Sequence, residues 1–410
     1  MKGRSSFIVA QLGARTHYAV PRILHRAGTL GHFYTDICAV KGWPKLLGSI
    51  PEPLRPMKLK KLLDRMPQGI PAEKITAFTK FGREYYRRRM SASTPSEITA
   101  THLWAGKTFC QLAIEKGFGE ANGVYTFNSA GLELLQAARS RELRTVMEQT
   151  IVPREVEEKL LSEERAAFPD WEGPSPRDDK VAEFMVRERA EWEIADIILC
   201  GSEFVKNGIS ASGGPVERCR IVPYGVDAGF SLPPRRPHQG PLRVLTVGVI
   251  GLRKGSPYVL EAAKRLRGRA HFRMVGPIAV SPIIEKELRT VVELIGPVPR
   301  SGVMYHYAWA DVFLLPSLCE GSATVTYEAM AAGLPVICTP NTGSVVRDGV
   351  EGFIVPVRDS ESIVKRMEEM MDDRTLREHL SENARQRREF ITLSAYAERL
   401  IDALGAGGER

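Results

Sequence analysis

The stretch LLPSLCEGSATVTYEAMAAGLPVICTPNTG, residues Leu314–Gly343, decides the fold of this chain. It starts inside an apolar run, 311–315, that is typical of a buried strand. A loop of small residues leads into a helical run, 324–332, which Gly333 ends. A second apolar run, 335–338, completes a strand–helix–strand unit. Ligands bind at such loops in open parallel sheets, so the stretch predicts an α/β fold with a binding site here.

The loop and the first helical turn carry the candidate ligand contacts. Backbone N–H groups at a helix start attract anions, and a glycine lets the backbone approach a ligand. These positions are Gly321, Ser322, Ala323 and Thr324. Thr324 and Glu328 share one helix face, about 6 Å apart along the axis. A phosphate at the helix start therefore leaves a sugar hydroxyl within reach of Glu328, while Glu320 lies on the other side of that phosphate.

Two glutamates spaced E-x7-E around this helix start resemble the donor site of the family-4 retaining glycosyltransferases, which have the GT-B fold. The surrounding motifs are also similar to those of that family: PS-x-x-EG, YEAMAAGLPVI-x-T and TG. The resemblance implies two Rossmann-like domains facing each other across a cleft. It also implies transfer of a sugar from a nucleoside diphosphate sugar with retention of configuration. The alternative is an ordinary strand–helix–strand unit with two solvated glutamates.

A second loop supplies the cations that a leaving diphosphate needs. It reads VIGLRKG at 249–255, directly after an apolar strand. By the resemblance, Lys254 keeps the position of the family's phosphate lysine, whereas Val249 stands where the family often has an arginine. Lys254 supplies a point charge and Arg253 a planar fork. We therefore expect Lys254, Arg253 and the loop N–H groups to stabilise the leaving diphosphate, and Glu320 to hold the sugar.

Four further positions are implied by the resemblance. Gly248 opens the cationic loop, and Val298 lies where the family cradles the base through backbone groups. Gly13 follows the first strand, in a loop expected to face the donor across the cleft. Gln149 ends a later strand at a position where the family often has a histidine, and a glutamine can bond a sugar hydroxyl but cannot titrate.

The chain divides at its proline-rich segments. We predict a first Rossmann-like domain over residues 1–230, on the acceptor side, and a linker over 231–241, SLPPRRPHQGP. The donor domain then covers 242–392, and a C-terminal helix over 393–410 crosses back to the first domain. Within the first domain, residues 169–176 read as another proline-rich linker.

Several classes of protein are disfavoured by what the sequence lacks. No apolar run approaches the roughly 20 residues needed to cross a bilayer. The six cysteines show no metal-ligand spacing and suit a reduced, cytoplasmic protein. No D-x-D triplet occurs, which agrees with donor binding that needs no metal and no other cofactor.

The net charge of +8 suits an anionic partner. The basic apolar segments 41–68 and 83–89 can lie on an anionic lipid surface, at the inner face of the membrane, or form solvated faces of helices. No nucleic-acid-binding motif is present, so nucleic acid is not expected. The expected acceptor is a hydroxyl of a glycan, a lipid or a small molecule.

Two other functions stay open at this point. One is a sugar-nucleotide 2-epimerase, which has the same fold but needs acid–base groups around the sugar. The other is a non-enzymatic basic protein that binds a polyanion or a membrane, with salt-dependent affinity and no affinity for nucleotides.

Overall fold

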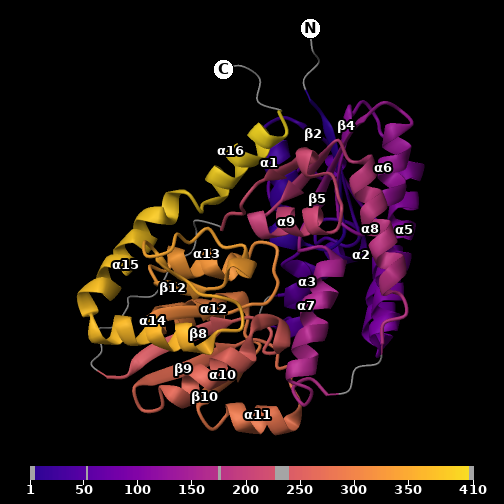
Figure 1. Ribbon diagram of the computed structural model, residues 1–410. Helices are drawn as coiled ribbons and strands as arrows, with labels where there is room; N and C mark the ends of the chain where they lie inside the picture. Colours follow the sequence, from indigo (N-terminus) through magenta and orange to yellow (C-terminus); the bar gives the residue numbers. More distant parts are fainter. Residues whose placement is uncertain (1–4, 52–53, 174–176, 227–239, 406–410) are drawn as a thin grey trace.

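The computed structural model describes residues 5–51, 54–173, 177–226 and 240–405. Two sheets organise the chain, one in each half, and all of their paired strands run parallel (Figure 1). The first sheet has the order β3 (Ile75–Ala77), β2 (Leu30–Thr35), β1 (Phe7–Gln11), β4 (Gly123–Phe127), β5 (Arg144–Gln149), β6 (Ile197–Cys200) and β7 (Cys219–Ile221). The second has the order β10 (Val292–Gly296), β9 (Ala270–Val275), β8 (Leu242–Val247), β11 (Val312–Leu315), β12 (Val336–Cys338) and β13 (Gly352–Ile354).

Helices cover both faces of each sheet, which explains why central strands are buried along their whole length. Every residue of β1, β4 and β11 is buried. The helices of the first half are α1 (Ala19–Arg26), α2 (Gly42–Leu47), α3 (Met57–Leu63), α4 (Thr79–Ser91), α5 (Pro95–Lys116), α6 (Leu132–Arg139), α7 (Arg154–Ala167), α8 (Val181–Ile194) and α9 (Glu203–Ala211). Those of the second are α10 (Ser256–Arg265), α11 (Pro282–Leu288), α12 (Arg300–Trp309), α13 (Thr324–Ala331), α14 (Ser360–Asp372), α15 (Arg374–Gln386) and α16 (Leu393–Ala403). The prediction of two parallel α/β domains is confirmed.

The strand–helix–strand unit forms as the sequence predicts. The helix α13 lies between β11 and β12, which pair side by side in the second sheet. Gly333 follows the helix with φ of +69°, a left-handed conformation that suits glycine. The N–H of Leu334 then donates to the carbonyl of Ala329 over 2.9 Å, which closes the helix end. The loop 316–323 is thereby placed at the carboxyl end of β11.

The last helix returns to the first half of the molecule (Figure 1). Tyr396 and Leu400 of α16 are buried in one hydrophobic cluster with residues of β1, α1 and β2. Arg144 Nη1, at the start of β5, donates to the carbonyl of Leu404 over 2.5 Å. Val226, near the end of the first half, pairs with the residues just before α16. The N–H of Val226 donates to the carbonyl of Ile391 over 2.8 Å, and the N–H of Leu393 donates to the carbonyl of Val226 over 3.0 Å.

The segment after α7 departs from the sequence prediction. Residues 169–176 were expected to be a linker, but Trp171 is 6% exposed and is part of the hydrophobic core of the second sheet. Glu164 of α7 is fully buried and accepts from Tyr258 over 2.7 Å and from Arg358 over 2.7 Å, both in the second half. Apolar burial and charge pairing therefore fix the end of α7 to the second domain. The linker predicted at 231–241 lies outside the described residues except for its last two, so that boundary stays a prediction.

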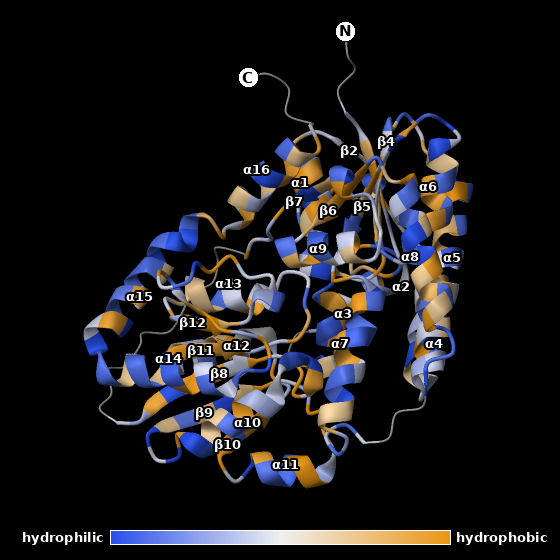
Figure 2. Cartoon of the chain, viewed as in Figure 1, coloured by the Kyte–Doolittle hydropathy of each residue, from blue (hydrophilic) through white to orange (hydrophobic). Residues whose placement is uncertain are grey.

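Hydropathy follows this architecture, with the strands coloured as hydrophobic and the outer helices carrying hydrophilic residues (Figure 2). In the described parts of the chain, no helix has both the length and the apolar character that a bilayer crossing requires.

Candidate active site

Three charged side chains meet at the carboxyl edge of the second sheet. Lys254 Nζ lies 2.6 Å from Glu320 Oε1, and Arg253 Nη1 lies 3.4 Å from the same oxygen. Lys254 and Glu320 are each 8% exposed. We call Arg253, Lys254 and Glu320 the cationic triad, because two cations and one carboxylate leave an excess positive charge in a largely buried place. An anion would complete it.

Two glycines hold the triad in position. Gly248 directly follows β8 with φ of +146°, and a Cβ there would lie 3.0 Å from Lys254 Cε, so the lysine stem crosses directly over it. Gly255 has φ of +70°, and a Cβ there would lie 2.0 Å from the carbonyl of Pro316. The short helix η5 (Leu252–Lys254) is thus pressed against the loop that carries Glu320. Gly248 acts by supporting Lys254, which is compatible with its predicted place at the donor loop.

The second predicted carboxylate faces a cavity of about 230 Å³ between the two domains. Thr324 and Glu328 line it from α13, and the other lining residues are Thr16, His17, Arg22, Gly225, Val226 and Leu393. Glu328 Oε2 accepts a hydrogen bond of 2.9 Å from the hydroxyl of Tyr307, which is fully buried on α12. Tyr307 was missed by the sequence analysis, because nothing in the spacing of a tyrosine 21 positions earlier points to this bond.

The first domain contributes a strained loop to that cavity. Thr16, His17 and Tyr18 have φ of 45°, 52° and 58°, a left-handed run that side-chain-bearing residues rarely adopt. Gly13 turns the chain into this loop with φ of +75°, and its N–H donates to Asp36 Oδ1 over 3.1 Å. Strain of this kind accumulates at ligand sites. Gly13 thus shapes the loop, while Thr16 and His17 reach the cavity.

Gly321, in the loop 316–323, makes a different contact from the one predicted. A Cβ on Gly321 would lie 1.9 Å from the carbonyl of Thr150 in the first domain, and Ser202 Oγ donates to the carbonyl of Gly321 over 2.5 Å. Gly321 therefore admits the backbone of the other domain rather than a ligand. Ser202 also caps α9, accepting from Val205 N over 3.4 Å.

The two residues that follow Gly321 also point away from a ligand. Ser322 Oγ is bonded to the hydroxyl of Tyr327 over 2.6 Å and to the carbonyl of Gly343 over 3.3 Å. The N–H of Ala323 donates to Thr342 O over 3.0 Å, so this amide is not open to a phosphate. Of the four predicted loop contacts, Thr324 is the one that lines the cavity.

The predicted contact of Gln149 with the donor sugar also differs from the structure, because the side chain cannot reach a sugar there. The side chain is fully buried and its amide is taken up: Nε2 donates to Glu188 Oε1 over 2.7 Å and to Ile151 O over 3.0 Å, and Oε1 accepts from Trp192 over 2.9 Å. The physical reason is α8, which packs against β5 and brings Glu188 and Trp192 over the end of the strand.

Val298 is partly buried and packs against the hydrophobic cluster that contains Tyr307 and Val247. Its side chain does not line the cavity beside Glu328. Contact of its backbone with a base stays a prediction.

The carboxylates beside Gln149 predict a pH dependence of stability. Burial raises the pKa of Glu188 to about 7, and burial also raises the pKa of Glu191 to about 7. The folded state therefore binds more protons than the unfolded state between about pH 4.5 and pH 7, so the free energy of unfolding should fall as the pH rises through this window. Denaturant titrations from pH 5 to pH 7.5 should show this fall, up to about 1.4 kcal/mol per pH unit for each group. A flat or rising profile in that window, or one unchanged in Glu188→Gln, contradicts the assignment.

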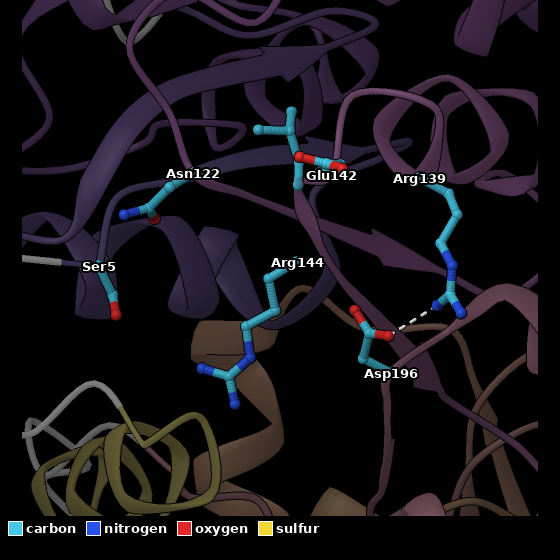
Figure 3. Close-up of a pocket in the computed structure, with 7 residues that line it drawn as sticks. Ser5, Asn122, Arg139, Glu142, Arg144 and Asp196 are labelled. Atoms are coloured by element: carbon cyan, nitrogen blue, oxygen red, sulfur yellow. Dashed lines mark hydrogen bonds and ion pairs between the residues drawn. The ribbon is translucent and has the colours of Figure 1, made fainter. Parts of the chain in front are cut away.

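A larger cavity, about 490 Å³, lies elsewhere and does not fit a donor site (Figure 3). It is lined by residues next to the amino ends of strands, including Asn122, Arg144 and Asp196. Arg139 and Asp196 are paired there over 2.7 Å. Ligands of parallel sheets bind at the opposite, carboxyl edge, where the cationic triad lies.

Within the described stretches, no three His, Cys, Asp or Glu side chains are grouped as ligands of a metal would be. Donor binding without a metal or another cofactor stays a prediction.

Comparison with known families gives one match. Residues 233–387 match the family model described as glycosyl transferases group 1. This range contains the cationic triad, Thr324 and Glu328.

Curated relatives agree with that match over a part of their length. The chain is 28% identical over 185 residues to the amylovoran biosynthesis glycosyltransferase AmsK of Erwinia amylovora, covering 41% of this chain and 46% of the relative. It is 30% identical over 189 residues to the putative colanic acid biosynthesis glycosyltransferase WcaL of Escherichia coli, covering 42% and 47%. The matches thus span about half the length of these relatives.

Solved structures share the architecture over nearly the whole chain. HepE of Anabaena in complex with UDP superimposes with a TM-score of 0.63 at 13% identity, covering 99% of this chain and 100% of that one. Sucrose-phosphate synthase of Thermosynechococcus elongatus gives a TM-score of 0.65 at 17% identity, with 98% of each chain covered. The fold is therefore GT-B, as predicted.

Proposed function

We propose that this chain is a retaining glycosyltransferase of group 1, similar to family 4, that uses a nucleoside diphosphate sugar. The observation that carries the proposal is the 2.6 Å pair between Lys254 and Glu320, which brings together two loops 66 positions apart at the carboxyl edge of one sheet. The match of residues 233–387 to the group 1 model supports it, because both loops lie inside that range. The whole protein's activity is our inference from these observations.

In this proposal the cationic triad binds the diphosphate of the donor. The ammonium group of Lys254 carries three N–H donors and forms an ion pair of 2.6 Å with Glu320. Its charge and that of Arg253 then stabilise the negative charge that grows on the leaving diphosphate, in a site that is already assembled. No metal or other cofactor is needed for this stabilisation. Glu320 keeps the lysine in place and accepts from hydroxyls of the transferred sugar.

The bond changes balance without an enzyme base. The bond from the anomeric carbon to the diphosphate oxygen breaks, and a bond from the same carbon to the acceptor oxygen forms on the same face. The acceptor proton passes to the departing phosphate oxygen. The proposed acceptor is a hydroxyl of a glycan or of a lipid-linked glycan, since the curated relatives named above act in polysaccharide biosynthesis.

A ligand screen tests the donor site. Thermal unfolding is measured with UDP, GDP and ADP and with their glucose conjugates, without added metal. A donor at 100 times its dissociation constant should stabilise the fold by about 2.7 kcal/mol. Failure of all of these nucleotides to shift the transition would overturn the proposal. Turnover of a sugar nucleotide to an epimer, with no glycoside formed, would indicate the epimerase instead.

Glu328→Gln tests the ribose contact within that screen. Glu328 is held by Tyr307 and faces the cavity, so we expect its carboxylate to accept from the ribose hydroxyls. Loss of a hydrogen bond to a charged group weakens binding by roughly tenfold or more. The KM for the donor should rise by that factor while kcat changes little. Equal KM values for the variant and the parent protein would contradict the role, and Glu293→Gln, an exposed glutamate on β10, serves as the control.

A further inference from the structure

One segment of the chain carries a strong excess of positive charge. Residues 41–98 contain 13 of the 57 lysines and arginines and only five of the 49 aspartates and glutamates. This difference equals the net charge of +8 of the whole chain, so the charges of all other residues sum to zero. A solvated protein surface distributes its charges more evenly, and a local excess attracts anions.

Exposed hydrophobic side chains gather in the same segment. Of the 13 large hydrophobic residues that are exposed in the described chain, eight lie between positions 43 and 98. Five of these belong to α2, α3 and the residues beside them: Trp43 (40% exposed), Leu46 (74%), Leu54 (72%), Met57 (52%) and Met66 (38%). Single exposed hydrophobic residues are ordinary, but these five lie on or beside two helices that contact each other.

Basic side chains are interleaved with this group. Lys45 is exposed next to Leu46, and Lys60 and Lys61 are exposed on the same short helix as Met57. Figure 2 shows hydrophobic and hydrophilic residues mixed along α3. We call Trp43, Lys45, Leu46, Leu54, Met57, Lys60, Lys61 and Met66 the α2–α3 surface.

The topology puts this surface at the cleft edge of the first domain. α2 and α3 connect β2 to β3, so they follow the carboxyl end of β2. The loop Arg15–Tyr18 follows the carboxyl end of β1, which pairs in parallel with β2. The α2–α3 surface and the loop that lines the interdomain cavity therefore belong to the same edge of the sheet (Figure 1).

We propose that the α2–α3 surface docks on a membrane that contains anionic lipid. Apolar side chains that insert at the depth of the headgroups, with lysines beside them, are the chemistry that binds such an interface. A purely ionic partner would leave Trp43, Leu46 and Leu54 without a function, and an apolar protein partner would leave the lysines without one. Docking does not depend on the proposed transferase activity, although it brings the cleft edge to a lipid-borne acceptor.

Vesicle sedimentation tests the docking. The full chain should bind vesicles of phosphatidylcholine with 30% phosphatidylglycerol, bind pure phosphatidylcholine weakly, and release as salt is raised. Lys60→Ala with Lys61→Ala should weaken binding by roughly 30-fold, at about fivefold for each lysine. Leu46→Glu should weaken it by roughly tenfold or more.

Two matched controls keep the test specific. Ile283 on α11 is 75% exposed, so Ile283→Glu changes the same chemistry on the other domain, and Arg265→Ala with Arg267→Ala removes two exposed charges from the second domain. Both controls should bind vesicles like the parent protein. Absence of vesicle binding, equal loss in the controls, or binding that ignores lipid charge would overturn the proposal. The proposal would also be overturned if the protein does not bind vesicles but self-associates, and Leu46→Glu abolishes that self-association. A second copy of the chain would then be the partner of this surface.

Thermal shifts induced by nucleotides should be unchanged in all of these variants. Failure of membrane docking can therefore be distinguished from failure of the donor site.

Discussion

Replacing Lys254 by alanine should lower turnover of the nucleotide sugar by roughly 100-fold or more, the scale on which the loss of one pre-organised electrostatic contact is felt. The lysine is 8% exposed and its ammonium group lies 2.6 Å from Glu320, so its position is already fixed before any donor arrives. Its charge matters most when the diphosphate departs, and the loss should therefore fall on kcat more than on KM.

The measurement is steady-state kinetics with the donor identified by the ligand screen. Lys264→Ala is the matched control, since that lysine pairs with Glu287 over 2.7 Å on the exposed side of the neighbouring helix α10. The control should keep parental turnover. Lys254→Arg should retain part of the activity, because it keeps the charge but changes the geometry. If Lys254→Ala kept the kcat of the parent protein, the proposed catalytic role of the cationic triad would be wrong.

The largest expected loss of stability follows from replacing Glu191 by alanine. This carboxylate is fully buried on α8 and accepts from the N–H groups of Ser129 (2.7 Å), Gly131 (2.9 Å) and Leu132 (3.1 Å) at the start of α6. Its removal leaves three backbone donors without an acceptor and takes a counter-charge from Arg187, 3.9 Å away. We expect the free energy of unfolding to fall by about 3–5 kcal/mol.

Denaturant unfolding measures this loss, with Glu193→Ala as the control because Glu193 lies exposed two positions along the same helix. Glu191→Gln should fall between the two, since an amide keeps one oxygen acceptor but presents N–H groups to the other donors. A cost below about 1 kcal/mol for Glu191→Ala would show that the loop after β4 does not depend on this carboxylate.

The parts of the structure that depend on local pattern were predictable from the sequence. The strand–helix–strand unit at 311–338 is encoded by apolar runs and by Gly333, and those signals act over a few residues. The proximity of the loops that carry Lys254 and Glu320 was expected from their resemblance to a known family, since both follow strands of one parallel sheet. The direct ion pair between the two side chains was not predicted.

The contacts between domains were not predictable in the same way. Trp171 lies among prolines and polar residues, yet it is buried in one hydrophobic cluster with strands that come about 70 and more positions later. Gly321 was assigned to a ligand, because no local signal shows that Thr150 of the other domain occupies the adjacent space. The prediction for Gln149 was wrong for a similar reason, since its partners Glu188 and Trp192 come from a helix about 40 positions away. Such contacts depend on tertiary packing, which the periodicity of a segment does not report.

The contacts of Gly321 with the other domain have a consequence for the kinetics of nucleotide binding. Gly321 packs against Thr150 and bonds to Ser202 of the other domain, so we expect these contacts to break before a bulky diphosphate binds between the two domains. Opening then precedes capture, and the observed association rate should level off at high nucleotide concentration instead of rising without limit. Stopped-flow traces would reveal that plateau, whose height is the opening rate of the empty protein.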